Sequence, residues 1–282
     1  GRRLKLEPGE VIYTDTETLY LPATASRFDS REDNFRFLKA AATYLWAQTR
    51  FGTWQQGVIE ALAGYEEAAT ALRLFHVLET LRLNGCIARE LPGIHRDMEH
   101  LNRLDGQGAL SPDWAHHRAQ LSAPGAKVQD SLTLLARLMT LSPELPSALC
   151  YQGELFPERV EEVLLARLAD EKAGLRSLLV RYRNELEAEQ PDPDSTPPQT
   201  RDAPFSARKK ESPEQPGEYE IELAFRDKPV APPENVKQLL TSIMLDLGEI
   251  PPDYLVPAGD GAWKPRNAGE GDEDPSADVW SG

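Results

Sequence analysis

The sequence has few cysteines, fewer basic than acidic residues, and no long hydrophobic run. Its two cysteines, Cys86 and Cys150, are too few for a disulfide framework, so we expect a reducing, cytoplasmic environment. Lys and Arg number 31 against 46 Asp and Glu, and the net charge of −15 argues against nucleic acid or an anionic membrane surface as the main partner. No apolar stretch approaches the ~18–20 residues of a membrane span, so none is expected.

The sequence also lacks the short motifs of common catalytic and cofactor sites. It contains no GxxxxGK[ST], GxGxxG, GxSxG, HExxH or CxxC. His95 and His100 are five residues apart, which places them about 140° apart around a helix and prevents them from gripping one zinc ion. Asp113 precedes His116 and His117, but adjacent helical residues diverge by about 100°, so we interpret this stretch as a solvated loop. We predict no catalytic residue, no metal and no cofactor, and therefore a non-enzymatic protein.

Charge and proline divide the chain into two regions. Residues 185–282 hold 22 Asp and Glu against 9 Lys and Arg, and 15 of the 23 prolines lie beyond residue 190. Such a composition buries too little apolar surface to offset its ordering entropy, so we predict a disordered linker. The resulting division has five parts: an N-terminal extended or β segment (1–28), a helical domain (29–188), the linker (189–216), a strand plus helix (217–250) and an acidic tail (251–282).

Apolar residues recur at helical spacing through most of the first region. Ser30 offers an N-cap, and Pro92-Gly93 interrupts a long pattern. A loop punctuated by Gly and Pro covers 105–125. We therefore expect a mostly α protein, with a small β element and a long acidic, Pro-rich linker. The expected helices are 31–51, 54–64, 65–91, a shorter one through Leu101, 128–141, 158–189 and 232–248.

Two segments predict strands. Residues 10–22 are rich in Thr, Tyr, Val and Ile. In residues 219–225, Tyr, Ile, Leu and Phe alternate with Glu and Ala, which is typical of a strand with one buried face. Because the tail offers this strand no other partner, we expect 219–225 to pair with 11–21; the alternative is that it pairs with a strand of another domain or of another protein.

Three segments resemble a known family in their order along the chain. They are "LFHVLETLRLNGCIARELPGIHRDM" (74–98), "YLPATASRFDSREDNFRFLKAAATYLWAQTRFGTW" (20–54) and "LGEIPPDYLVPAG" (247–259). The first resembles the helix and Pro-Gly signature upstream of the von Willebrand factor A domain in the NorD/CbbO family. Glu79 and Arg82 match its Glu-x-x-Arg pair, and Pro92 and Gly93 match its Pro-Gly.

The resemblance implies an adaptor. Family members work with a MoxR-type AAA+ ATPase ring to activate a target metalloenzyme, nitric oxide reductase in one branch and rubisco in another. The chain begins with Gly-Arg-Arg and ends at "DVWSG", about where the family continues into its A domain. We therefore expect a fragment of a longer protein, or a protein that contacts its target differently.

The matched residues are the candidate site. Glu79 and Arg82 are three residues apart on one helix face and can pair. We expect a surface ion pair that, with Pro92 and Gly93, either docks a partner or locks the corner before the next helix. The alternative from another class is an all-α, metal-dependent hydrolase using Glu and His residues of helices 65–105, since catalytic groups assemble in space.

Overall fold

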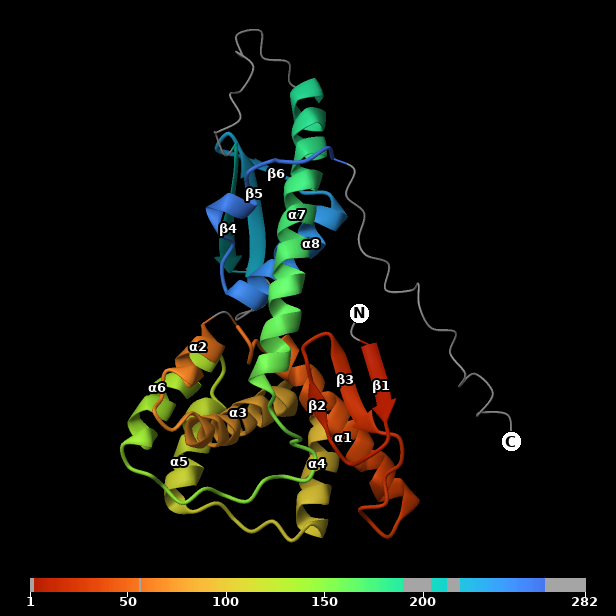
Figure 1. Cartoon of the computed structure of the whole chain (residues 1–282), viewed down its shortest axis with the longest axis vertical. Coiled ribbons are helices and arrows are strands. Elements are labelled where there is room, and N and C mark those ends of the chain that lie inside the picture. The colour runs from red at the N-terminus through yellow and green to blue at the C-terminus, as the bar shows by residue number, and fades with distance from the viewer. Residues whose placement is uncertain (1–2, 56, 190–203, 212–218, 262–282) are drawn as a thin grey trace, which may run out of the picture.

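The computed structural model describes residues 3–55, 57–189, 204–211 and 219–261. The fold is mostly α with small β elements, as the sequence predicts (Figure 1). The helices are α1 (Arg31–Arg50), α2 (Val58–Ala63), α3 (Ala68–Glu90), α4 (Pro92–Leu104), α5 (Pro112–Leu121), α6 (Val128–Met139), α7 (Pro157–Glu189), α8 (Glu234–Leu247) and the 3-10 helix η1 (Pro252–Tyr254). The strands are β1 (Arg3–Glu7), β2 (Tyr13–Thr14), β3 (Thr18–Pro22), β4 (Phe205–Glu211), β5 (Tyr219–Phe225) and β6 (Lys228–Val230).

Local signals account for where several helices begin. The hydroxyl of Ser30 accepts a hydrogen bond from the amide N–H of Asp33 at 2.9 Å and caps α1, as predicted. Pro92 occupies the first turn of α4, where its missing N–H costs nothing. The predicted loop over 105–125 is wrong for residues 112–121, which form α5. Ser111 caps this helix and Pro112 follows in its first turn.

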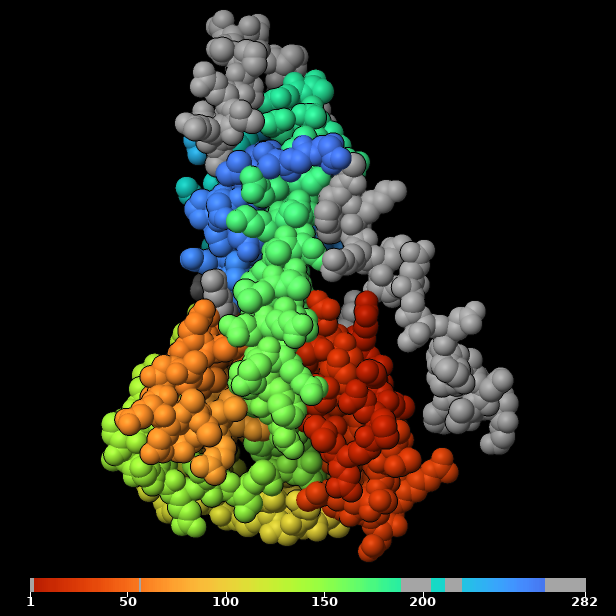
Figure 2. Space-filling view, in the orientation of Figure 1, coloured from red at the N-terminus to blue at the C-terminus, as the bar shows by residue number. Residues whose placement is uncertain are grey.

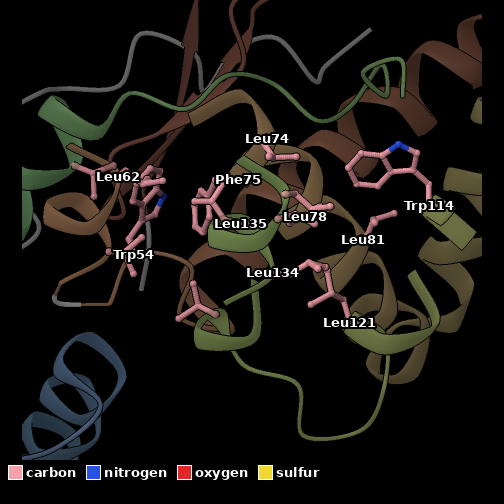
Figure 3. Packing of buried hydrophobic residues seen from close by; sticks show 14 residues of the cluster. Trp54, Leu62, Leu74, Phe75, Leu78, Leu81, Trp114, Leu121, Leu134 and Leu135 are labelled. Carbon is pink, nitrogen blue, oxygen red and sulfur yellow. The ribbon is translucent and has the colours of Figure 1, made fainter. Parts of the chain in front are cut away.

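Strands β1–β3 and helices α1–α6 form the lower lobe of Figure 1, and α3 lies at its centre, between two hydrophobic clusters. Leu74, Phe75 and Leu78 face the first cluster with side chains of α2, α5 and α6 (Figure 3). Leu83 and Ile87 face the second cluster, with side chains of α1 and α4. A helix that packs on both sides must be apolar around most of its circumference, which explains why α3 shows no single stripe.

The N-terminal segment forms a three-stranded sheet in the order β1–β3–β2, with β1 parallel and β2 antiparallel to β3. The turn between β2 and β3 places Thr16 at a φ of 81°, an uncommon conformation for a residue other than glycine. Asp15 stabilises this turn, because its carboxylate accepts hydrogen bonds from the amide N–H groups of Glu17 and Thr18 at 2.9 and 2.7 Å.

Helix α7 connects the lower lobe to a second one, the upper lobe of Figure 1. Its 33 residues span ~50 Å. Its C-terminal half packs with α8 and with one face of the antiparallel sheet β4–β5–β6; the buried residues of this third cluster are Leu175, Leu178, Leu179, Tyr182, Phe205, Leu223, Phe225, Val236, Leu240, Ile243 and Leu255. The predicted boundary at 188 lies one residue before the end of α7, and α7 contributes side chains to both lobes.

The second sheet corrects two predictions about the tail. The sequence predicts disorder throughout 189–216, yet residues 205–211 form β4; residues 190–203 and 212–216 lie outside the described residues. β5 pairs with β4 and β6, and not with 11–21. Its buried face is the predicted one, because Leu223 and Phe225 belong to the third cluster. Leu255 is also buried there, so the first residues of the expected tail pack against this lobe.

Arg167, in the N-terminal half of α7, connects this helix to α8 and to the turn between β2 and β3. Its Nε donates to Asp246 of α8 at 2.8 Å, and its Nη1 donates to the Thr16 hydroxyl at 2.9 Å. Both Arg167 and Asp246 are largely buried. In the space-filling view α7 runs continuously from the lower lobe, beside the N-terminal segment, into the upper one (Figure 2).

Candidate functional site

The ion pair of Glu79 and Arg82 lies in the interior. The two side chains are 1% and 2% exposed. Arg82 donates two hydrogen bonds to the Glu79 carboxylate, from Nε to Oε1 at 2.7 Å and from Nη2 to Oε2 at 2.6 Å. The hydroxyls of Thr53 and Ser131 donate to the same carboxylate at 2.5 and 2.7 Å. Arg82 also donates to the carbonyl of Phe51 at 3.1 Å, so the pair ties α3 to the 51–53 segment and to α6.

This environment keeps both groups charged. Burial raises the pKa of Glu79, but the Arg82 charge and the hydrogen bonds outweigh it and hold that pKa below its usual range. Burial lowers the pKa of Arg82, and the adjacent carboxylate more than compensates. The sequence predicts a surface pair here. That prediction is wrong, because both side chains are enclosed, and they therefore cannot contact a partner protein.

The pair does not lock the Pro-Gly corner either. α3 continues for two turns beyond Arg82 before it ends, and Arg82 donates to Glu79, Thr53 and Phe51, none of which belongs to the corner. Leu91 and Ile94 instead anchor the corner by packing against the second cluster. Pro92 and Gly93 themselves are exposed and remain accessible.

The histidines are scattered. His100 contacts Asp33 of α1 at 2.8 Å, and hydrogen bonds from Ser30, Arg36 and His100 lower the pKa of Asp33 to about 2. Burial lowers the pKa of His76 to about 4, and its Nε2 is enclosed without a partner. Across residues 3–55, 57–189, 204–211 and 219–261, no group of three His, Cys, Asp or Glu side chains could hold a metal ion.

His116 and His117 lie on α5 and differ in burial. Their ring centroids are 5.9 Å apart, with His117 buried edge-on against Trp114 and His116 exposed. Both line a pocket of about 520 Å³ between α5 and the end of α6. This stretch is therefore a helix with one buried histidine, and not the solvated loop that was expected.

A second hollow, the α3–α4–α5 cleft, has a volume of about 560 Å³. Six of its lining residues come from 74–98, the segment that carries the family resemblance. The cleft is lined by Leu81, Asn84, Gly85, Ala88, Arg89, His95, Glu99, Arg118, Ser122 and Pro124.

The cleft depends on close contact between α3 and the end of α5. A Cβ added to Gly85 would lie 2.7 Å from the Cα of Ser122, so only glycine permits this approach. Nη1 of Arg89 donates to the Ser122 carbonyl at 2.6 Å and fixes the same contact. Arg118 is exposed and forms no ion pair within the described part of the chain. The cleft thus carries two arginines against one glutamate, on a chain whose net charge is −15.

Sequence reasoning missed this cleft because it singled out the charged pair of the same segment. Asn84-Gly85 was the available signal: a glycine within a helical pattern costs about 1 kcal/mol and often marks a close approach.

The fold and its clefts thus define a two-lobed, mostly helical protein with an open basic cleft. Comparisons with protein-family models, with curated proteins and with solved structures each found no match. In the described residues, no helix is long and apolar enough to cross a membrane.

Proposed function

We propose that the protein is a non-enzymatic adaptor that links a MoxR-type AAA+ ATPase ring to a target metalloenzyme, and that the α3–α4–α5 cleft is its docking site for the ATPase. One observation carries this proposal. In the segment that resembles the NorD/CbbO signature, the charged pair is buried, and Asn84, Arg89 and His95 line an open cleft.

The charge of the cleft indicates what it binds. Arg118 is exposed and unpaired within the described residues, and Arg89 and His95 lie on the same cleft. A basic recess on an otherwise acidic protein attracts an acidic segment and repels basic ones. The expected contact on the ATPase is therefore an acidic loop or helix.

An adaptor also needs a second surface for its target. The upper lobe is joined to the lower one through α7 and the Arg167 contacts. It belongs to the part of the chain that holds most of the negative charge. A target with a basic patch would bind there, away from the ATPase.

The alternative, a metal-dependent hydrolase, gains no support from a specific contact. Glu79, one of the carboxylates of helices 65–105, already accepts hydrogen bonds from Arg82, Thr53 and Ser131. His76, one turn earlier on α3, forms no hydrogen bond to it among the described contacts.

The test uses charge reversal in the cleft. Arg118→Glu should weaken binding to the ATPase ring at least about tenfold, because it replaces a favourable charge pair with repulsion. Arg73→Glu is the matched control, since Arg73 is exposed on α3 outside the cleft. Biolayer interferometry on immobilised full-length variants measures both. Equal affinity for both variants would exclude the cleft as the docking site.

A further inference from the structure

The outer edge of β1 is unpaired in the described structure. β1 is bonded to β3 on one side, and it lies at the outer end of its sheet (Figure 1). Leu4 and Leu6 are 61% and 58% exposed. An exposed strand edge that carries apolar side chains is a template for pairing with another strand.

The direction of the β1 backbone is fixed by two hydrogen bonds. The Arg3 N–H donates to the Glu17 carbonyl at 2.9 Å, and the Glu7 carbonyl accepts from the Ala23 N–H at 2.9 Å. Alternate residues of a strand present their N–H and C=O groups to opposite sides. Residues 3, 5 and 7 therefore point toward β3, whereas the N–H and C=O groups of Leu4 and Leu6 point outward.

The exposed leucines continue a row of core residues. In the β1–β3 register Leu4 lies beside Leu19 and Leu6 beside Leu21, so the four side chains share one face of the sheet. Leu21 is buried in the second cluster, and Leu19 packs against it. The apolar face of this sheet thus extends beyond its last strand, where nothing in the described residues covers it.

We propose that β1 pairs antiparallel with β1 of a second copy of this chain, about a twofold axis, to form a continuous six-stranded sheet. In this register Leu4 lies opposite the partner's Leu6 and Arg3 lies opposite the partner's Glu7. The four outward backbone groups of each copy are then satisfied by interchain hydrogen bonds. The leucines form one apolar cluster on one face of the sheet, and two Arg–Glu pairs lie on the other face.

The sequence RLKLE selects this register. A shift of one residue would turn the leucines against charged side chains. A shift of two residues in one direction places Leu4 opposite Pro8, which has no N–H to donate. A shift in the other direction places Lys5 opposite Arg3 twice. The proposed register leaves a single like-charged contact, Lys5 with the partner's Lys5, and each lysine has Glu7 of its own chain 3.2 Å away.

Charge complementarity favours a second copy over an unrelated strand. The pattern basic–apolar–basic–apolar–acidic is complementary to itself when reversed, because its first and last residues carry opposite charge. Two five-residue strands bury less than the ~1,000 Å² typical of stable interfaces, so the dimer is weak and reversible.

Cross-linking tests the register. At the axis the two Lys5 positions form a non-hydrogen-bonded pair, in which the side chains are closest. The full-length Lys5→Cys variant should therefore form a disulfide-linked dimer under mild oxidation. Glu7→Cys is the matched control, since it faces the partner's Arg3 and should not cross-link. Equal cross-linking of both variants, or of neither, overturns the register.

A charge swap tests the self-association by sedimentation over a concentration series. Arg3→Glu and Glu7→Arg should each weaken the dimer roughly tenfold, because each places like charges opposite one another. The double variant restores the pairs and should regain the wild-type dimer. Leu6→Pro should abolish it without loss of folding, because the N–H that it removes points outward.

Either of two results overturns the proposal. One is a single species of about 31.4 kDa at every wild-type concentration. The other is a dimer that the double swap does not restore. Slow amide exchange at Leu4 and Leu6 in a monomeric protein would mean that another segment of the chain occupies the edge.

Discussion

Replacing Arg82 with Met removes the positive charge beside Glu79 and keeps a side chain of similar length. Glu79 is 1% exposed, and the variant would leave it with only the hydroxyls of Thr53 and Ser131. Removing one partner of a buried ion pair costs about 3–5 kcal/mol, because the other charge is left uncompensated. That loss is a large share of the ~5–15 kcal/mol that stabilises a typical domain.

The loss should depend on pH. In the wild type the pKa of Glu79 lies below its usual value, so its contribution is present above the unfolded pKa and fades as the pH falls through the folded one. Without Arg82, burial would raise this pKa above the unfolded value. The penalty of the variant then grows as the pH rises through the raised pKa. The difference from wild type is therefore larger at pH 8 than at pH 5.

Urea unfolding followed by circular dichroism at both pH values measures this difference. Arg73→Met is the control, since Arg73 is exposed on the same helix and should change stability by less than about 0.5 kcal/mol. The double variant Glu79→Gln with Arg82→Met should recover part of the loss and show no added pH dependence. A single variant within about 1 kcal/mol of wild type at pH 8 would refute the structural role of the pair.

Three further substitutions test the packing of α3. Leu78 is fully buried, so Leu78→Ala should cost about 2–5 kcal/mol, and an unchanged melting temperature would contradict its placement. Burial lowers the pKa of His76 to about 4, so stability should fall by about 2 kcal/mol between pH 7.5 and 5; His76→Gln should flatten that profile, and a profile equally steep would count against it. Gly85→Ala should cost about 1–3 kcal/mol through its clash with Ser122, whereas wild-type stability would show that α3 and α5 are not in close contact.

The helices could be predicted because their signals are local. Ser30 caps α1 as its sequence neighbours indicate, and Pro92 begins α4. α5 carried equally local signals, Ser111 followed by Pro112, but glycines and prolines around it favoured a loop.

In the second sheet β5 was predicted, but β4 was not, because β4 depends on tertiary contacts. Its central residues Arg208, Lys209 and Lys210 hide the alternation that identifies a strand. The strand forms because Phe205 completes a core with Leu223 and Phe225 of β5. Such tertiary packing overrides the local sequence pattern when the neighbouring strand would otherwise lack a partner.

The sequence predicted which residues form the candidate pair, but not where the pair lies in the molecule. Spacing shows that Glu79 and Arg82 can pair, but it does not show whether they are exposed. Their depth is set by Thr53 and Ser131, which lie 26 and 52 residues from Glu79 along the chain. The cleft of the same segment requires Arg118 from another helix, which no sequence spacing indicates.

The most direct test of the adaptor proposal is binding of the full-length chain to a purified MoxR-type AAA+ ring, measured by analytical ultracentrifugation with a nucleotide that keeps the ring assembled. The account predicts that the chain co-sediments with the ring, that Arg118→Glu weakens this binding at least about tenfold, and that Arg73→Glu leaves it unchanged. If the wild-type chain and the ring sediment separately at concentrations of tens of micromolar, the chain is not an adaptor for that class of ATPase.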